Sequence, residues 1–467
     1  MTEDLPTGCC DVATNLVIGK VRGDTQRLCG GLTIKALHRL KQKSRIMTAL
    51  VGILNKRAVA IAADSAITVS YASDERKKIY NTGQKIFRLS EAQPVGVMLY
   101  NNVEFMSTPW EVIIKLYHDR CGHHNLPLLK DYKEDFVKFL HDNQFFTTEA
   151  EQRMLHLDTL RDCVRKVHES ASEEYSQANE ANLDDLPVCE QLPYYEKWTD
   201  ELIAGCRSDG VSAEFEDYTF DMFMDYSREY FQTIHEDIKE NDIPTKKGMW
   251  EKACYEFIRS KHVWNFTGLV FVGYGADQIF PAIYEIGIDI AYDGRLRLIE
   301  NEDSYSAITA VDKQSEIMSF AQDDVIKTLL KGLAPNIKEQ YDSVIGNGLD
   351  SMKGNAMDIM KSAKVPPAIR EKIGKMDNTE ILDKINEDMD DYIAFEYIFG
   401  LYDSVAYFNV QDMATMAESL ISITKLQRHI TSSEETVGGP IDVAVITRSE
   451  GFTWVRHKTW AGDSAGQ

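Results

Sequence analysis

The sequence lacks the features that mark several classes of protein. Its eight cysteines include no CxxC pair, which argues against a disulfide framework and against a paired-cysteine zinc module. No apolar run reaches the about 18 residues that a membrane-spanning helix needs. Positive charge is scarce, since 51 lysines and arginines stand against 74 acidic residues. A surface this acidic repels phosphate groups, so we expect no nucleic-acid partner and no membrane.

The composition is that of a folded protein with a substantial core. The 467 residues are 43% hydrophobic and 27% charged, which fits one core with large insertions or two domains. The scattered cysteines fit a reducing compartment, and no apolar segment of signal-peptide length opens the chain. We therefore expect a cytoplasmic protein.

Composition changes along the chain divide it into six parts. The first ends in the one basic cluster of the sequence, between Lys35 and Arg45, and we interpret it as a leader or a misassigned extension. The remaining parts alternate between strand-rich and helix-rich texture. We predict a leader at 1–46, core segments at 47–125, 264–332 and 395–460, and helical insertions at 126–263 and 333–394.

Strand and helix signals within the core segments predict a layered α+β fold. Two apolar runs joined by a three-residue polar turn indicate a hairpin at 48–63, buried on both faces. Further strands are expected at 85–89, 95–100, 266–274, 283–290, 295–299, 441–447 and 452–457, and helices at 110–117, 320–331 and 410–429. Without the insertions, this order predicts two antiparallel sheets with helices outside, a four-layer α/β/β/α sandwich.

No cofactor is indicated. Gly273-Tyr-Gly275 lacks the third glycine of a dinucleotide-binding loop and lies between strands. Cys121, His123 and His124 are residue types that bind metals, but no second cluster at zinc spacing accompanies them. We expect an exposed turn there and no metal site.

Three motifs in order, together with the C-terminus, carry a family resemblance. They are Met47-Thr48-Ala-Leu-Val-Gly-Ile, then Ala62-Ala63-Asp64-Ser65-Ala-Ile-Thr68, then Lys85-Ile-Phe-Arg-Leu89. Near the end, Gly438-Gly439-Pro440 opens an apolar strand, and a turn then leads into Gly451-Phe-Thr-Trp-Val455. Over roughly half of the chain this resembles the bacterial type of proteasome-like N-terminal-nucleophile (Ntn) hydrolases.

The resemblance implies a role for each matching residue. Thr48 would be the nucleophile, Lys85 its electrostatic partner, and Asp64 the residue that holds Lys85. Thr68 would bind an extended peptide, and the backbone N–H of Tyr100 or Asn101 would face the oxyanion. Taken singly, each residue is better explained structurally: Thr48 as a strand residue, Asp64 as a strand end and Lys85 as a solvated edge charge. Taken together and in order, they favour the catalytic interpretation.

The chemistry of such a site explains this set of residue types. A threonine hydroxyl needs a base, and a free α-amino group, with a reference pKa of about 7.7–8.0, serves near neutral pH. A nearby ammonium keeps the pKa of that amine low and stabilises developing negative charge. The product of the first step is an acyl-threonine ester, which water hydrolyses. The resemblance thus predicts a threonine-type peptidase that hydrolyses peptide or unfolded-protein substrates. It also predicts that the protein forms a homo-oligomer.

Several positions depart from the family pattern. Thr48 follows Met47, and only removal of that residue frees its amine; translation from Met47 with methionine trimming is one route. The auxiliary serine is undecided among Ser304, Ser306 and Ser319. Two alternatives stay open: a non-catalytic structural subunit with an N-terminal extension, and an Ntn-type amidase acting on a small molecule.

Overall fold

The computed structural model describes residues 48–70, 77–81, 83–300, 302–375, 377–431 and 437–458. The described residues mix helix and sheet, so the expected α+β class is confirmed. Among the described helices, none combines the length and apolarity that crossing a bilayer requires.

The first sheet has five antiparallel strands in the order β13-β1-β2-β14-β15. Every residue of β1 and β2 is buried, which explains why both run as unbroken apolar sequence. Their bounds are Ala49–Asn55 (β1), Ala58–Asp64 (β2), Ser315–Ala321 (β13), Ile441–Thr447 (β14) and Gly451–Arg456 (β15).

The second sheet has the order β11-β10-β9-β6-β5, and β12 also pairs with β10. The strands are Ile86–Arg88 (β5), Val95–Asn101 (β6), Thr267–Gly273 (β9), Ala282–Tyr292 (β10), Arg295–Ile299 (β11) and Tyr305–Ala307 (β12). Two small hairpins lie apart from these sheets: β3 (Ile67–Ser70) with β4 (Lys77–Tyr80), and β7 (Glu104–Phe105) with β8 (Thr108–Pro109).

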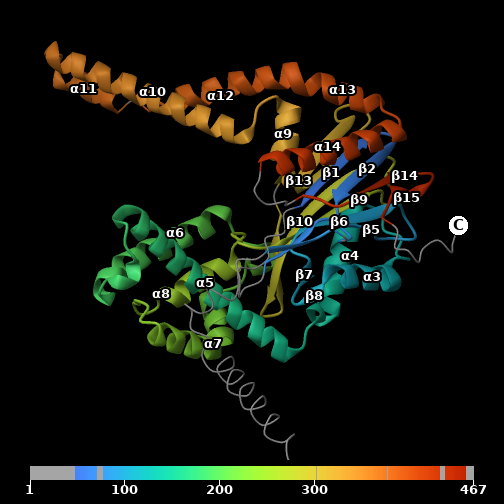
Figure 1. Cartoon of the computed structure of the whole chain (residues 1–467), viewed down its shortest axis with the longest axis horizontal. Coiled ribbons are helices and arrows are strands. Elements are labelled where there is room, and N and C mark those ends of the chain that lie inside the picture. The colour runs from blue at the N-terminus through green and yellow to red at the C-terminus, as the bar shows by residue number, and fades with distance from the viewer. Residues whose placement is uncertain are drawn as a thin grey trace, which may run out of the picture.

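Side-chain alternation along β1 assigns each sheet face its partner. Leu50 and Leu54 pack in one apolar cluster with Met98 and Ile283 of the second sheet. Val51 and the other alternate residues pack in a different cluster with α14 (Val410–Thr431). The outer face of the second sheet is covered by α3 (Trp110–Cys121) and α4 (Leu129–Asp142). Figure 1 shows the helices on either side of the strands.

The first helical segment forms a body with a core of its own. Its cluster contains Trp250, Phe215 and Phe223, and it meets the sheets through Tyr292 at the end of β10. The helices are α5 (Glu149–Asn179), α6 (Val188–Asp209), α7 (Phe220–Glu240) and α8 (Met249–Arg259). Among the aromatic residues of this segment, Tyr218, Phe223 and Phe231 are buried, whereas Phe220 is exposed.

The second helical segment projects from the body as an arm (Figure 1). Its long helix α10 buries no residue, and α11 buries none either. The segment comprises α9 (Asp324–Lys331), α10 (Pro335–Ser362), α11 (Pro367–Gly374), α12 (Thr379–Ile393), η5 (Ala394–Ile398) and α13 (Phe399–Tyr407). We call α10, α11 and α12 the arm.

One predicted helix begins four residues later than expected, and the strand before it was missed. A helix was expected over 320–331, but Phe320 belongs to β13, opposite Leu50 of β1, and the helix begins only at Asp324. The strand was missed because β13 is an edge strand with polar residues Ser315, Glu316 and Ser319, so its sequence lacks the apolar run of a central strand. Pairing with β1 imposes the strand conformation there.

Candidate active site

Four strand ends meet around the carboxylate of Asp64. Its Oδ1 accepts from the Lys85 ammonium at 2.8 Å and from the Ala49 N–H at 3.1 Å. Its Oδ2 accepts from the N–H groups of Ala66 at 3.2 Å and Gly438 at 3.1 Å. Asp64 and Lys85 are each 1% exposed. A buried carboxylate with four donors is fully satisfied, so this arrangement is rigid.

Strand register explains how residues far apart in sequence reach this point. Asp64 ends β2, next to the start of β1 in the hairpin, and lies opposite Ile441 of β14. That pairing brings Gly438, which precedes β14, to the carboxylate. Lys85 comes from the other sheet, immediately before β5, and thereby connects the two sheets at one end.

The electrostatics of Lys85 are set by opposing effects. Burial lowers the pKa of the Lys85 ammonium from its ordinary value, and this is the largest effect. The charge of Asp64 and its hydrogen bond raise the same pKa, whereas the nearby Lys458 lowers it further. When Lys85 is protonated, its positive charge lowers the pKa of neighbouring titratable groups.

Thr48 immediately precedes β1 and is fully buried. Its Oγ1 has no hydrogen-bond partner among the described residues, an unusual state for a buried hydroxyl. The residue is linked to Ala49, whose N–H donates to the same Asp64 oxygen that Lys85 contacts. The three predicted catalytic residues thus lie at one end of the two sheets. The nitrogen of Thr48 lies in the peptide bond to Met47.

A second ion pair, between the half-buried Lys458 and the buried Asp442, adjoins the first and was not anticipated. The Lys458 ammonium donates to Asp442 Oδ2 at 2.7 Å, to Ser65 Oγ at 2.7 Å and to the Gly83 carbonyl at 2.5 Å. Asp442 is 1% exposed. Asp442 is the one acidic residue in the apolar run of β14, and this could have indicated the ion pair from sequence. A buried carboxylate needs a charged or hydrogen-bonding partner.

Backbone direction distinguishes the two candidates for the oxyanion. In a strand, successive N–H groups point to opposite sides. The N–H of Leu99 donates to the Lys85 carbonyl, and that of Asn102 donates to the Phe266 carbonyl beside β9. The N–H of Tyr100 accordingly points toward β9, and that of Asn101 points toward the end of β5, where Lys85 lies. Asn101 also has a left-handed φ of 63°, which turns the chain at the end of β6.

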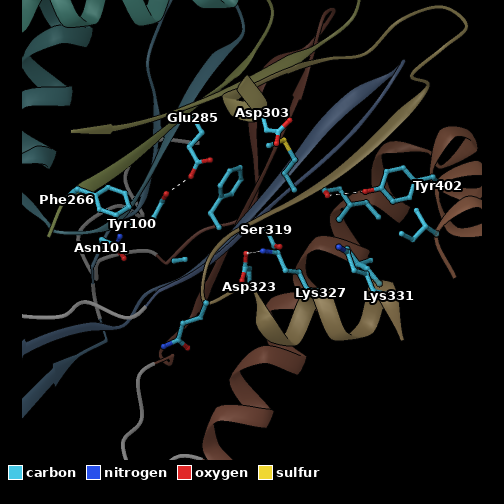
Figure 2. Close-up of a pocket in the computed structure, with 17 residues that line it drawn as sticks. Tyr100, Asn101, Phe266, Glu285, Asp303, Ser319, Asp323, Lys327, Lys331 and Tyr402 are labelled. Atoms are coloured by element: carbon cyan, nitrogen blue, oxygen red, sulfur yellow. Dashed lines mark hydrogen bonds and ion pairs between the residues drawn. The ribbon is translucent and has the colours of Figure 1, made fainter. Parts of the chain in front are cut away.

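A cavity of about 660 Å³ opens beside this end of the sheets. Figure 2 shows Tyr100, Asn101 and Phe266 on one side and residues of β13, α9 and α13 on the other. The Tyr100 hydroxyl donates to Glu285, and burial raises the pKa of that carboxyl. Ala321 and Gln322 line the cavity, and the Gln322 N–H donates to the Thr48 carbonyl at 3.1 Å. The cavity and Thr48 are therefore neighbours.

The remaining predicted positions are less closely connected to Asp64. Thr68 lies in β3, opposite Ile79 of β4. Of the serines considered as auxiliary groups, Ser319 lines the cavity and pairs with Val51, whereas Ser306 donates to Glu316. Ser304 is buried before β12.

One group of side chains within the described ranges could hold a metal ion. It consists of Cys121, His124 and Asp135, whose ligand atoms lie within 4.8 Å of one another. It lies between α3 and α4, away from Asp64, and is considered separately below.

Comparison with known proteins does not identify the chain: no protein-family model matches it, and no curated protein matches its sequence. Its function is therefore argued from residues and geometry.

Proposed function

We propose that this chain is a proteasome-like threonine-type amidohydrolase of the Ntn class, which cleaves peptide bonds through an acyl-Thr48 ester. The observation that carries the proposal is the buried Lys85–Asp64 pair at the start of β1, where the Thr48 hydroxyl lacks a partner. A structural threonine in a strand normally satisfies its hydroxyl, and a structural lysine normally keeps its ammonium in water.

The packing of the sheets supports the Ntn sandwich. The two antiparallel sheets share one apolar cluster, and helices cover their outer faces. Such a four-layer arrangement holds the start of β1 between the sheets, where a nucleophile on the first strand is flanked by both. The segments at 126–263 and 333–394 would then be insertions into this core.

The proposed reaction has two steps. The α-amine of mature Thr48 takes the hydroxyl proton as Oγ1 attacks the carbonyl carbon, and the proton then passes to the leaving amine as the C–N bond breaks. Water next attacks the ester carbonyl and gives a proton to the α-amine of Thr48. As the C–Oγ1 bond breaks, that amine passes the proton to Oγ1, which releases the acid and restores the threonine hydroxyl. Lys85 keeps the amine deprotonated through like charge, and Asp64 fixes Lys85.

Asn101 is the better candidate for the oxyanion donor. Its N–H points past the end of β5 on the side of Lys85, whereas the N–H of Tyr100 points toward β9. A backbone donor aimed at the developing charge typically contributes about 3–4 kcal/mol to transition-state stabilisation. Thr68, on the β3 hairpin next to the Asp64 segment, is proposed to bind an extended peptide as an added strand.

The cavity is proposed to take a side chain of a peptide or unfolded-protein substrate. Tyr100 lines it, between Phe266 at 5.9 Å and Phe320 at 6.3 Å between ring centroids. Charged residues line it as well, including Asp323 and Lys327, which pair at 2.5 Å. Aromatic and polar groups in one cavity suit a mixed peptide side chain.

Activity on this proposal requires removal of the residues before Thr48. In the full chain the Thr48 side chain is 0% exposed and its nitrogen is an amide, which cannot act as a base. These same facts favour the second candidate function, a non-catalytic structural subunit that keeps its N-terminal extension.

A covalent probe separates the two functions. A peptide epoxyketone closes a ring with the hydroxyl and the free amine of one residue, so it labels only an N-terminal threonine. We expect one adduct, on Thr48, in a chain trimmed to begin there. Thr48→Ala and a chain that keeps Met47 should give none. Thr447→Ala, at the opposite end of β14, is the matched control and should label normally. A folded, trimmed chain that takes no label and hydrolyses no fluorogenic peptide would favour the structural subunit.

We also propose a homo-oligomer, and the arm supports it. Ile337, Val344, Met352 and Ile359 of α10 are 52–70% exposed and lie on one side of the helix at spacings of seven and eight residues. An isolated helix in water gains little from propensity, so an apolar stripe of this length is normally covered. The tip, 353–375, has six basic and two acidic residues, and α12 has one basic and six acidic, so arms from two copies are complementary in charge.

A further inference from the structure

Three potential metal ligands converge where α3 passes into α4. Cys121 ends α3, His124 lies in the turn that follows, and Asp135 comes from the second turn of α4. Their ligand atoms all lie within 4.8 Å of one another, and each residue is half-buried. Cys121 is a free thiol. From sequence we expected only an exposed turn, because no second cluster at zinc spacing accompanies Cys121 and His124; Asp135 is eleven residues beyond His124 and was not considered.

The hydrogen bonds around this group orient its ligands. Asp135 Oδ2 is 2.9 Å from His124 Nδ1 and accepts from the Tyr117 hydroxyl at 2.8 Å. The turn itself is closed by the His124 N–H, which donates to the Cys121 carbonyl at 2.9 Å. His123 stacks edge-on against His124, at 4.8 Å between ring centroids, and is not one of the three.

The chemistry of the set matches zinc better than other common ions. A thiolate and an imidazole are ligands that calcium and magnesium avoid, and zinc accepts sulfur, nitrogen and oxygen together. Zinc bonds of about 2.0–2.3 Å place tetrahedral ligand atoms about 3.3–3.8 Å apart, so shifts of about 1 Å close the site. Half-burial leaves room for water as the fourth ligand.

We propose that Cys121, His124 and Asp135 bind one Zn²⁺ ion, which clamps the end of α3 to α4. The clamp acts on the core because the turn is also bonded to the loop after β5. The Gly122 carbonyl accepts from Ser90 Oγ at 2.9 Å and from the Glu91 N–H at 2.8 Å. The ion thus stabilises the helices over the outer face of the second sheet. The inference is independent of the chemistry proposed for Thr48.

Titration of the metal-free full chain tests the site. Zn²⁺ is added in competition with a chromophoric chelator, and Co²⁺ is used as a spectroscopic substitute. We expect one tight site, with a sulfur-to-cobalt charge-transfer band. Cys121→Ser and Asp135→Asn should each weaken binding more than about 100-fold, and Tyr117→Phe, which removes a donor behind a ligand, about 10-fold. His123→Ala and Cys189→Ser, at an exposed cysteine, are matched controls that should bind as the wild type does.

Two results would overturn the proposal. One is a wild-type chain that fails to compete with the chelator for Zn²⁺ at micromolar concentration. The other is a cobalt band that survives Cys121→Ser, since it would assign the sulfur to another cysteine. Asp135→Asn also disturbs the hydrogen bond from Tyr117, so circular dichroism should verify that this variant is folded. If it unfolds, the zinc affinity of Cys121→Ser, which exchanges one atom, decides whether the site exists.

Discussion

Replacing Asp64 by asparagine is the sharpest test of the buried cluster. The carboxylate holds the ammonium of Lys85 and three backbone N–H groups, and both side chains are 1% exposed. Breaking a buried pair from one side typically costs about 3–5 kcal/mol of unfolding free energy. A buried lysine can also release its proton, which at pH 7 costs about 4–5 kcal/mol from an ordinary pKa. Both routes predict a loss of about 4 kcal/mol for Asp64→Asn.

The pH dependence of that loss distinguishes a charge effect from a packing effect. Burial already lowers the pKa of Lys85, and Asp64 opposes it, so the variant lowers that pKa further. The unfolded chain then binds a proton that the folded chain lacks, and stability rises with pH. Between the lowered pKa of Lys85 in the folded variant and the ordinary lysine pKa, the free energy of unfolding of the variant should rise with pH by up to about 1.4 kcal/mol per pH unit relative to wild type.

Hydrogen exchange during a urea titration measures the local free energy of unfolding around Asp64. A local measurement is needed because a chain of 467 residues need not unfold in one step. Peptides covering β1 and β2 should lose protection first in the variant. Asp390→Asn, which removes the exposed partner of Lys338 on the arm, should cost less than about 1 kcal/mol. Adding Lys85→Met to Asp64→Asn should restore most of the stability. An Asp64→Asn loss below 1 kcal/mol, or one unchanged between pH 7 and 9, would refute the reasoning.

Two further predictions concern other parts of the molecule. Burial lowers the pKa of His156 to about 4, so the unfolded state binds more protons between that pH and the ordinary value of 6.5. Stability should therefore fall by up to about 3 kcal/mol as the pH drops through this window, and His156→Gln should remove that share in acid titrations monitored by circular dichroism. On the arm, Val344→Lys with Met352→Lys should convert oligomers to monomers in sedimentation experiments, whereas Ser351→Lys should not; an unchanged mass would exclude the stripe as the interface.

The central strands were predictable because burial on both faces leaves a continuous apolar run. The bounds of β1, β2 and β14 match the prediction within one residue at each end. Edge strand β13 was not predictable, since its conformation depends on pairing with β1 far away in sequence. The sequence predicted that the arm is helical. It could not predict that the apolar side chains of α10 are exposed, because the same apolar spacing occurs in buried and in exposed helices.

The candidate site was predictable only in part. Thr48, Asp64 and Lys85 were selected by resemblance; local propensity alone treats them as strand ends and a surface charge. Contacts between the ends of distant strands carry no local signal, which is why Lys458 was missed. The same holds for Asp135, whose place beside Cys121 depends on how α4 packs against α3.

The way Asp64 is satisfied has a consequence for synthesis of the protein on the ribosome. Its donors include Gly438, which lies 374 residues further along the chain, and the adjoining cation Lys458 lies 393 residues beyond Ser65. A nascent chain that has emerged only through β2 and β5 holds the carboxylate and Lys85 but not these groups. The cluster is therefore complete only after Gly438 and Lys458 have emerged, so a translation product that ends before Gly438 cannot form it.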